Sequence, residues 1–410
     1  MKRKLLFLFG VSLALAACTK NNQSPASSEL SKTGTPALGD RTLATSGNAA
    51  INAATVQQTV EGFGGASILQ YIADLTSAQR TTAFSPTTGI GLSILRVAVD
   101  TSSSAFAAEV PTINAAKSFG AKVIATAWYA PASMVSNDMV KPSSYAAFAA
   151  HLKAFNTAVG GVTAISPINE PNDTGGAFLQ DSAPDVANFV AQQGANCGAP
   201  IMAPEPFNMS QSFITTFLSN STAAANTSFV CGHIYGATPA VVSSGGKQVW
   251  MTEHYTNSSV SGNDWPNAMT AAKEISDCMN VGWSAYVWWY IRRSYGPIDE
   301  SSNITKLGYV MSQFARYVRP GYVKVSCTYN PSTGVYVTAY KSGTKLVIVI
   351  VNQNAATTFQ TFSISGLTVT GFNRFFTNST TNIGSNSFTI TGGSFGINLT
   401  GSSVTTLVSE

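Results

Sequence analysis

The sequence predicts a (β/α)8 barrel, the TIM-barrel fold, with an all-β sandwich module attached at its side. Three observations predict it. The chain has 410 residues, which suits a barrel of ordinary size plus one smaller domain. Up to Pro320, short apolar runs alternate with helical stretches, the pattern of parallel β/α units. Beyond Pro320 the runs are short, rich in β-formers and separated by Gly, Ser, Asn and Thr, as in a sandwich.

The first segment predicts a signal peptide. A basic start is followed by the apolar run 5–17, which is too short to span a bilayer. The stretch 15–18 reads Leu-Ala-Ala-Cys and has the form of a bacterial lipobox, in which Cys18 is acylated and becomes the mature N-terminus. Ordinary cleavage after Ala16 or Ala17 is the alternative. We therefore expect an exported protein, anchored by lipid to the outer membrane or cell surface, or else secreted.

Composition divides the rest of the chain. After the signal peptide and lipobox of 1–18, residues 19–50 are rich in Ser, Thr, Pro, Ala and Asn without apolar periodicity, which predicts a flexible linker. We expect the catalytic barrel over 51–320. The β-sandwich is expected over 321–410, with one further strand contributed by 51–58.

Eight apolar runs are candidates for barrel strands, and eight strands close a barrel. These runs are 61–66, 92–99, 122–127, 162–168, 200–203, 228–234, 248–252 and 284–290. Apolar residues at three- and four-residue spacing predict helices between them. Such helices are expected at 145–158, 185–193, 265–280 and 306–317. Strands of the β-module are expected at 322–329, 335–341, 345–352, 358–364, 372–376, 387–390 and 403–408.

Charge and cysteine content narrow the classes of partner. Charged residues are only 10% of the chain and the net charge of +4 falls to +1 without the three basic residues of the leader, so nucleic acid is not an expected partner. A surface built from Ser, Thr, Asn and Gln suits contact with neutral polymers. No Cys-X-X-Cys or paired-His spacing occurs, so we expect no metal. Three pairings remain open for the four cysteines after the leader, which are Cys197, Cys231, Cys278 and Cys327.

Two glutamates follow the predicted strands four and seven directly. Glu170 lies in Asn-Glu-Pro and Glu253 in Thr-Glu-His. In a barrel the active site lies at the carboxyl ends of the strands, and hydrolysis of a glycosidic bond needs one carboxylic acid to protonate the leaving oxygen and a second group to attack or stabilise the sugar. We therefore predict that the pair is catalytic, the alternative being ion-pair or capping roles. Asn169 is a candidate donor to the sugar 2-hydroxyl, or else a turn former.

Dispersed motifs resemble glycoside hydrolase family 30 of clan A. They are Val-Glu-Gly-Phe-Gly-Gly at 60–65, Asn-Glu-Pro at 169–171 and Thr-Glu-His-Tyr at 252–255. The run Tyr-Val-Trp-Trp-Tyr-Ile-Arg-Arg-Ser-Tyr-Gly at 286–296 closely resembles the signature of the bacterial glucuronoxylanase subfamily, as does 308–322. The resemblance covers the chain from Gln57 to the C-terminus.

The resemblance implies a retaining endo-β-1,4-xylanase that needs no cofactor. It would cut glucuronoxylan at positions set by 4-O-methylglucuronic acid branches, with Glu170 as acid/base and Glu253 as nucleophile. Arg293 would pair with the branch carboxylate, which a guanidinium binds in bidentate fashion. Arg292 is expected to be structural, because adjacent residues on an extended segment point opposite ways. The other residues expected to line the branch pocket are Tyr255, Ser258, Trp289 and Tyr295, although Trp289 could instead be buried in the barrel.

Two aromatic residues are further candidates for contact with the substrate. Trp128, at the end of strand three, is expected to stack on a backbone xylose, and Tyr235 is expected to bond to the nucleophile. Core packing is the alternative for both. The stretch 128–131 reads Trp-Tyr-Ala-Pro, which departs from the Trp-Ser-Pro-Pro that we associate with the family.

Three polar residues complete the prediction. Arg96, on strand two, is expected to be a buried partner that keeps Glu253 ionised. His233, beside Tyr235, is a candidate supporting residue. Glu205, after strand five, is a rival acid that we expect to line the cleft or to be structural.

Two other functions remain open. One is a family-30 glycosidase of other specificity, such as a uronate-independent xylanase, a β-1,6-glucanase or a glucosylceramidase-like enzyme. The other is a non-catalytic glycan-binding lipoprotein. The expected partners are xylan with glucuronic acid branches and, only through a lipid at Cys18, a membrane. The chain is expected to act as a monomer.

Overall fold

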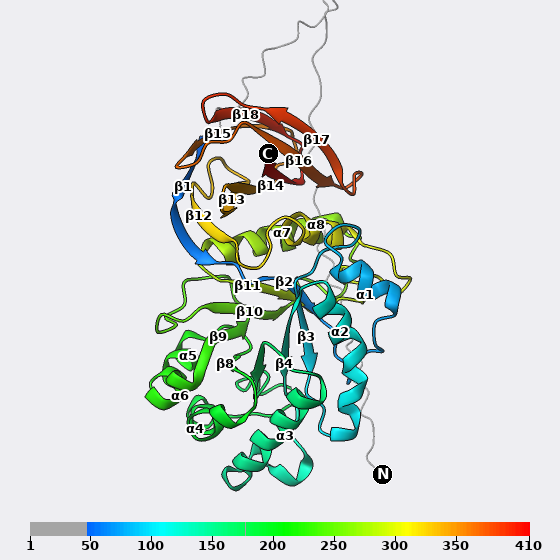
Figure 1. Ribbon diagram of the computed structural model, residues 1–410, viewed down its shortest axis with the longest axis vertical. Coiled ribbons are helices and arrows are strands. Elements are labelled where there is room, and N and C mark those ends of the chain that lie inside the picture. The colour runs from blue at the N-terminus through cyan, green and yellow to red at the C-terminus, as the bar shows by residue number, and fades with distance from the viewer. Residues whose placement is uncertain (1–46, 177) are drawn as a thin grey trace, which may run out of the picture. The chain divides into compact units, whose positions relative to one another are not determined.

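A computed structural model of the chain describes residues 47–176 and 178–410. The predicted leader with Cys18, and most of the predicted linker, lie outside the described residues. The described part holds a closed eight-stranded parallel barrel and a curled nine-stranded β-sheet (Figure 1). Within it, none of the helices is long and apolar enough to cross a membrane.

The barrel contains all eight predicted strands in chain order, which confirms the predicted fold class. Neighbours pair in parallel, and the last strand pairs with the first to close the barrel. The strands are β2 (Gly62–Ala66), β3 (Ile94–Ala98), β4 (Lys122–Thr126), β7 (Ala164–Ser166), β8 (Ile201–Pro204), β9 (Thr227–His233), β10 (Val249–His254) and β11 (Ala285–Trp288).

Helices lie around the barrel and begin at recognisable caps. Thr76 and Gln79 form a capping box at the first helix, and Ser182 accepts from the backbone N–H of Asp185 at the start of the fourth. The helices are α1 (Ser77–Phe84), α2 (Val110–Ser118), α3 (Tyr145–Ala158), α4 (Ala183–Gln193), α5 (Gln211–Leu218), α6 (Ser221–Asn226), α7 (Trp265–Asn280) and α8 (Lys306–Ala315). Short 3-10 turns are η1 (Ser103–Glu109), η2 (Ala132–Met134), η3 (Pro142–Ser144) and η4 (Gly194–Asn196).

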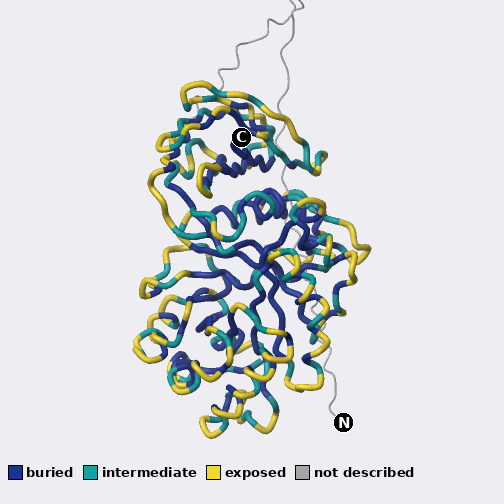
Figure 2. The backbone as a smooth tube through the Cα atoms, in the orientation of Figure 1, coloured by how far each residue is buried: buried dark blue, intermediate teal, exposed yellow. Residues whose placement is uncertain are grey.

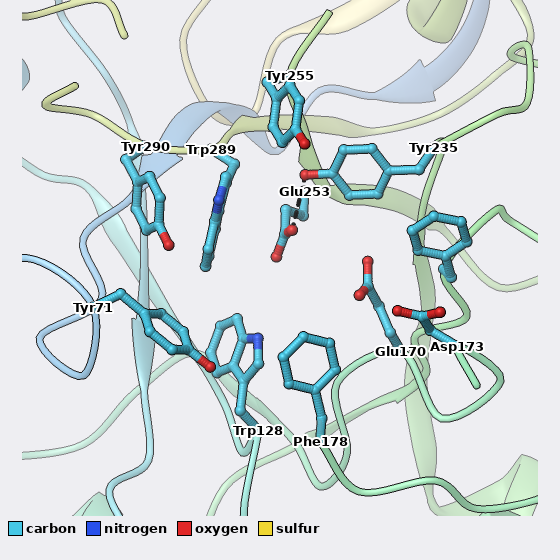
Figure 3. Close-up of a pocket in the computed structure, with 11 residues that line it drawn as sticks. Tyr71, Trp128, Glu170, Asp173, Phe178, Tyr235, Glu253, Tyr255, Trp289 and Tyr290 are labelled. Carbon is cyan, nitrogen blue, oxygen red and sulfur yellow. Dashed lines mark hydrogen bonds between the residues drawn. The ribbon is translucent and has the colours of Figure 1, made fainter. Parts of the chain in front are cut away.

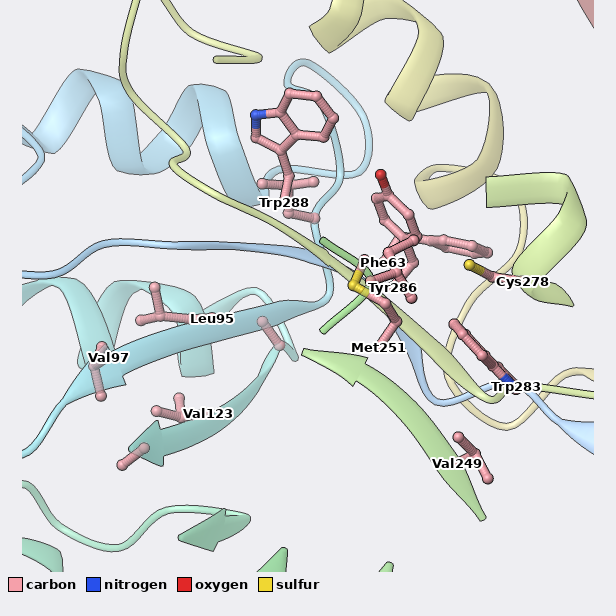
Figure 4. Packing of buried hydrophobic residues seen from close by; sticks show 14 of the residues in the cluster. Phe63, Leu95, Val97, Val123, Val249, Met251, Cys278, Trp283, Tyr286 and Trp288 are labelled. Atoms are coloured by element: carbon pink, nitrogen blue, oxygen red, sulfur yellow. The ribbon is translucent and has the colours of Figure 1, made fainter. Parts of the chain in front are cut away.

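Adjacent residues of a barrel strand belong to different cores, because side chains alternate along a strand. Trp250 belongs to a small cluster drawn from seven barrel strands, which fills the barrel interior. Met251, its neighbour, belongs to the large cluster between strands and helices. Figure 4 shows that second cluster, with Phe63, Met251 and Tyr286 of three neighbouring strands near Cys278 of α7. In Figure 2 the barrel strands are buried and the exposed residues gather on the loops.

The nine-stranded sheet curls around a core of its own. Ile51, Val337, Phe372 and Leu399 come from widely separated strands of the sheet but share one buried cluster. The strand order is β17-β16-β19-β14-β13-β12-β1-β15-β18. The strands are β1 (Asn48–Thr59), β12 (Val323–Cys327), β13 (Val335–Ser342), β14 (Lys345–Asn352), β15 (Thr358–Ser365), β16 (Gly371–Asn378), β17 (Gly384–Thr389), β18 (Ser394–Leu399) and β19 (Ser403–Ser409).

The sheet takes β1 from before the barrel and its neighbour β12 from after it. Where the chain enters and leaves the barrel, the Val60 N–H donates to the Tyr322 carbonyl at 2.7 Å and the Gly321 N–H to the Val60 carbonyl at 2.9 Å. Helix α8 joins the two parts as well, since Gln313 donates to Thr377 at 2.8 Å and accepts at its carbonyl from Thr406 at 2.7 Å.

Three features differ from the expectations. The strand β18 lies where no strand was predicted. A two-stranded hairpin, β5 (Val135–Ser136) and β6 (Met139–Val140), follows the third barrel strand. The cysteines whose pairing was left open, Cys197, Cys231, Cys278 and Cys327, form no disulfide, and three of them are buried.

Candidate active site

A pocket of about 380 Å³ opens at the carboxyl ends of the barrel strands. Both glutamates lie in its wall, and Figure 3 shows their carboxylates facing one another across the pocket. Its lining consists of Tyr71, Trp128, Glu170, Asp173, Phe178, Phe207, Tyr235, Glu253, Tyr255, Trp289 and Tyr290.

Glu253 reaches the pocket because its strand is irregular. Met251 packs between the barrel and its helices, and strict alternation would send Glu253, two residues on, in the same direction. The pairing of β10 with β9 shifts between these two residues, and such an irregularity re-aims a side chain. The carboxylate then accepts from Tyr235 Oη at 2.9 Å and from Arg96 Nη1 at 2.5 Å.

Glu170 lies on the loop that follows β7 and has a left-handed backbone, with φ of +45°. Such a conformation costs a non-glycine residue about 1–3 kcal/mol, and residues of this kind cluster at functional sites. Its N–H donates to the Glu205 carbonyl at 3.1 Å, and Nδ1 of His233 lies 2.6 Å from its Oε1. An oxygen of Glu170 and one of Glu253 lie within 4.8 Å of each other.

A buried network of charges lies beneath the pocket, centred on Arg96. The guanidinium is fully buried, and besides Glu253 it bonds to Asn169 Oδ1 at 2.7 Å and to Glu205 Oε1 at 3.2 Å. Glu205 also accepts from Thr126 at 3.1 Å. Glu205 does not line the pocket, so it serves as a structural counter-ion rather than as a wall of the cleft.

The network sets the protonation of its members. Burial lowers the pKa of His233, but the charges of Glu253 and Glu170 outweigh this and raise that pKa to about 9. Burial raises the pKa of Glu205, but Arg96 and His233 outweigh it and lower that pKa to about 2. Burial raises the pKa of Glu170, and His233 opposes the rise without cancelling it. Glu170 is therefore suited to hold a proton in a site where Arg96 and His233 are positive.

Asn169 has an amide nitrogen with no partner among the described residues, although the side chain is buried. Its oxygen is occupied by Arg96, which fixes the amide orientation and leaves Nδ2 as the free donor. A buried donor without a partner costs about 1–3 kcal/mol, and a ligand hydroxyl would satisfy it.

The predicted aromatic residues surround the carboxylates. Trp128 is almost fully buried yet lines the pocket, with its ring 4.4 Å from the guanidinium carbon of Arg96. Trp289 is half-buried and also lines the pocket, whereas its neighbour Trp288 is the buried barrel residue. Tyr255 lies between Tyr235 and Tyr295, with ring centroids at 5.2 and 5.5 Å.

Arg293 lies on the loop after β11 with its guanidinium carbon 5.4 Å from the ring centroid of Tyr290, and it forms no ion pair with any described residue. Arg292 donates to the backbone carbonyl of Ala73 at 2.8 Å, as a structural residue does. Neither Arg293 nor Ser258 lines the pocket itself. Arg293 contacts the ring of Tyr290, which does line it, whereas Ser258 is exposed on the loop after β10. The structure therefore groups Arg293 with the aromatic residues but leaves Ser258 apart from them.

Five pocket residues were not predicted from the sequence. Tyr290 belongs to the motif at 286–296 and could have been found there. The others lie on loops whose path the sequence does not reveal. These five residues are Tyr71, Asp173, Phe178, Phe207 and Tyr290.

The described residues contain one cluster that could hold a metal ion, formed by Glu170, His233 and Glu253. Arg96 already bonds to Glu253, and His233 carries a proton at neutral pH because its pKa is raised to about 9. A divalent cation there would face two positive charges at close range, so we assign the cluster to proton chemistry.

Glucuronoxylanases and xylanases are among the known proteins whose sequences and structures resemble this chain. The chain is 37% identical over 384 residues to the glucuronoxylanase XynC of Bacillus subtilis strain 168, covering 87% of this chain and 90% of that protein. A glycoside hydrolase family 30 subfamily 8 xylanase from Clostridium acetobutylicum superposes with a TM-score of 0.82 at 31% identity, covering 88% and 99% of the two chains. A family 30 endoxylanase from Clostridium papyrosolvens C71 gives 0.82 at 28% identity over 88% and 100%. No protein-family model matches the sequence.

Proposed function

The chain belongs to glycoside hydrolase family 30, and on this basis we propose that it hydrolyses the xylan backbone with retention, at positions set by glucuronic acid branches. It is a glycoside hydrolase, an endo-xylanase that acts on glucuronoxylan. The observation that carries the proposal is the pair of facing carboxylates at the strand ends.

The spacing of the pair supports retention. Retaining glycosidases hold their carboxyl groups about 5–5.5 Å apart, whereas inverting enzymes leave about 6.5–9.5 Å for a water molecule. One oxygen of Glu170 and one of Glu253 lie within 4.8 Å of each other, which is nearer to the retaining spacing than to the inverting one. In our proposal Glu253 attacks the anomeric carbon to give a covalent glycosyl-enzyme while Glu170 protonates the leaving oxygen, and Glu170 then takes a proton from the water that releases the product.

The surrounding groups suit these two roles. Tyr235 and Arg96 both donate to Glu253, so they orient the attacking carboxylate and stabilise its charge before the reaction. The raised pKa of Glu170, caused chiefly by burial, keeps the proton that the leaving xylose needs. We assign the free amide donor of Asn169 to the sugar 2-hydroxyl, where a hydrogen bond strengthens in the transition state.

Arg293 supports recognition of the uronate. It has no carboxylate partner among the described residues, so its charge is available to a ligand. Arg293 interacts with Tyr290 and Tyr295, whose rings contact Trp289 and Tyr255 respectively, and this group offers ring faces and hydroxyls to a sugar. In the proposal the branch lies over these residues, Arg293 binds its carboxylate, and Ser258 reaches it by a movement of the exposed loop.

The test is the product profile from glucuronoxylan. The wild type should release products that each carry one uronate at a fixed position, and Glu253→Gln should lower the rate by about 10³-fold or more. Glu61→Gln is a matched control, because Glu61 bonds to Lys122 and Gln248 at the opposite end of the barrel and should leave the rate unchanged. Products with uronates at random positions would refute the branch-set cleavage, and products of inverted configuration would refute the mechanism.

We also propose that the enzyme is exported and held at the membrane by a lipid on Cys18, with the barrel acting as a monomer. The support is the lipobox form of 15–18. Cys18→Ser should move the protein from the membrane fraction to the soluble fraction. Recovery of the wild type in the soluble fraction would show that it is secreted without an anchor.

A further inference from the structure

A second pocket, of about 320 Å³, adjoins the active-site pocket. The two share Phe178, which forms part of both walls. The second pocket is lined by Tyr129, Ala130, Ala132, Val135, Ser136, Asn137, Asp138, Phe178 and Leu179. The mechanism proposed above makes no use of it.

Two aromatic rings form the wall that faces the active site. Tyr129 and Phe178 meet edge to face with ring centroids 6.2 Å apart. Gly176 leaves room for this arrangement, because a Cβ there would lie 2.5 Å from the ring of Phe178. The Tyr129 and Tyr71 hydroxyls lie 3.3 Å apart, which ties this wall to a residue of the active-site pocket. Both rings line the second pocket, so the wall offers aromatic surface to a ligand that extends out of the active site.

The opposite side of the second pocket is the polar turn of the β5–β6 hairpin. Asn137 and Asp138 have φ of +52° and +59°, the geometry of a tight hairpin turn. The Gln180 N–H donates to the Asp138 carbonyl at 2.8 Å and fixes the turn against the loop after β7. The side chains of Ser136, Asn137 and Asp138 are exposed and make no hydrogen bond to described residues, so they are available to a ligand.

The charge of the second pocket indicates what it can bind. Asp138 is the one ionisable acid or base among its lining residues other than Tyr129, so an anion would be repelled. One face is aromatic and the other offers hydroxyl, amide and carboxylate groups, the combination that binds the apolar face and the hydroxyls of an uncharged sugar.

The position of the second pocket assigns it to one end of the substrate. In Figure 3, Tyr255 lies on one side of the two carboxylates and Phe178 on the other. Tyr255 belongs to the side proposed for the uronate branch. Phe178 lies on the same loop as Glu170, the group that protonates the leaving oxygen in the proposed mechanism. The second pocket therefore extends the cleft on the leaving-group side.

We propose that the second pocket is a subsite for an uncharged xylose unit of the leaving part of the chain, with Tyr129 as the ring on which that unit rests. The proposal rests on the proposed function. It predicts that a longer leaving part speeds cleavage, because the remote sugar contributes binding energy in the transition state.

The test uses two xylo-oligosaccharides with the same single uronate branch, one with a single xylose on the leaving side and one with three. For the wild type, kcat/KM should be about three- to tenfold higher on the longer substrate, the size expected for one aromatic contact. In Tyr129→Ala this ratio should fall to near one. Tyr129→Phe keeps the ring but loses the contact with Tyr71, so it should keep the wild-type ratio.

The outcomes separate the two proposals. If the wild type cuts neither oligosaccharide, the proposed function fails and the subsite fails with it. If the wild type cuts both at equal rates, or if Tyr129→Ala keeps the wild-type ratio, only the subsite is refuted. A ratio lost equally in Tyr129→Ala and Tyr129→Phe would also refute it, since the ring would then have no role.

Discussion

Two regions of the cleft are built in opposite ways. The charged floor consists of Arg96, Asn169, Glu170, Glu205, His233 and Glu253, and the aromatic rim consists of Tyr255, Trp289, Arg293 and Tyr295. Four of the six residues of the charged floor lie on a strand or directly after one, Asn169 and Glu170 lie on the loop after β7, and all six are buried. Residues of the aromatic rim lie at or beyond the strand ends, are partly exposed, and meet chiefly through ring contacts.

This difference in construction indicates a difference in role. The charged floor is suited to bond cleavage, and the aromatic rim is suited to selecting the substrate. Bond cleavage depends on positions held to a fraction of an ångström, which buried and mutually bonded groups on strands can provide. Recognition of a branch needs surface that can vary without harm to the fold, and loops provide it. Changes in the charged floor should therefore alter stability and rate on every substrate, and changes in the aromatic rim should alter the ranking of substrates.

The largest effect on stability is expected from Arg96→Met. This change leaves Glu205 and Glu253 buried without their common counter-ion, and loss of one partner from a buried pair costs about 3–5 kcal/mol. The free energy of unfolding in guanidinium chloride measures the loss. Arg80→Met is the matched control, because Arg80 pairs with a single carboxylate, Asp74, and that pair is partly exposed, so its loss should cost less than that of Arg96. If both variants lost the same free energy of unfolding, the buried ion pairs of the charged floor would contribute no more to stability than a partly exposed pair.

His233→Asn tests the charge balance of the floor through pH. The pKa of His233 is raised to about 9 in the folded chain from about 6.5, so its stabilising contribution is complete below pH 6.5 and is lost as the pH rises through 9. The wild type should therefore lose up to about 3 kcal/mol of unfolding free energy over this range, and His233→Asn should not show this loss.

The same variant should shift the pH profile of kcat/KM. Protonated His233 lowers the pKa of Glu170, so its removal should raise that pKa and move the alkaline limb of the profile to higher pH. An unchanged alkaline limb would show that His233 does not control the proton on Glu170.

A smaller and selective effect is expected from Arg293→Ala in the aromatic rim. Loss of a charged contact worth about 1.5–3 kcal/mol should lower kcat/KM on glucuronoxylan about 10- to 100-fold, with little change on unbranched xylo-oligosaccharides. Arg292→Ala is the control, because Arg292 bonds to a backbone carbonyl and should not change the ratio of the two substrates. If Arg293→Ala lowered kcat/KM equally on both substrates, Arg293 would contribute to cleavage in general, like the charged floor, and not to the choice of substrate.

The sequence predicted the barrel well because each strand is an apolar run between helical stretches. It missed β18, although Phe395, Ile397 and Leu399 alternate along it, because Gly, Asn and Thr residues dominate its surroundings. The hairpin β5–β6 was not predicted because each of its strands has only two residues. Local pattern thus reveals elements that bury a continuous apolar face and not those that depend on tertiary contacts.

The candidate site was likewise predictable only in part. Glu170 and Glu253 could be predicted as site residues because the carboxyl ends of barrel strands converge independently of the conformation of the loops. The bond between Glu205 and Arg96 could not be foreseen, because sequence does not show which strand-end acids turn inward. Tyr71 and Phe178 reach the pocket from loops whose path depends on packing against other loops.

The strand β1 has a consequence for how such enzymes can be recombined. It precedes the barrel in the chain, but its 12 residues pair with β12 and β15, which follow it. A chain that ended at Gly321 would keep β1 without either partner and expose Ala49, Ile51 and Ala53, which are now buried. The sheet therefore cannot be exchanged through one fusion point. A chimera needs two, at Val60 and Gly321, which already lie hydrogen-bonded to each other.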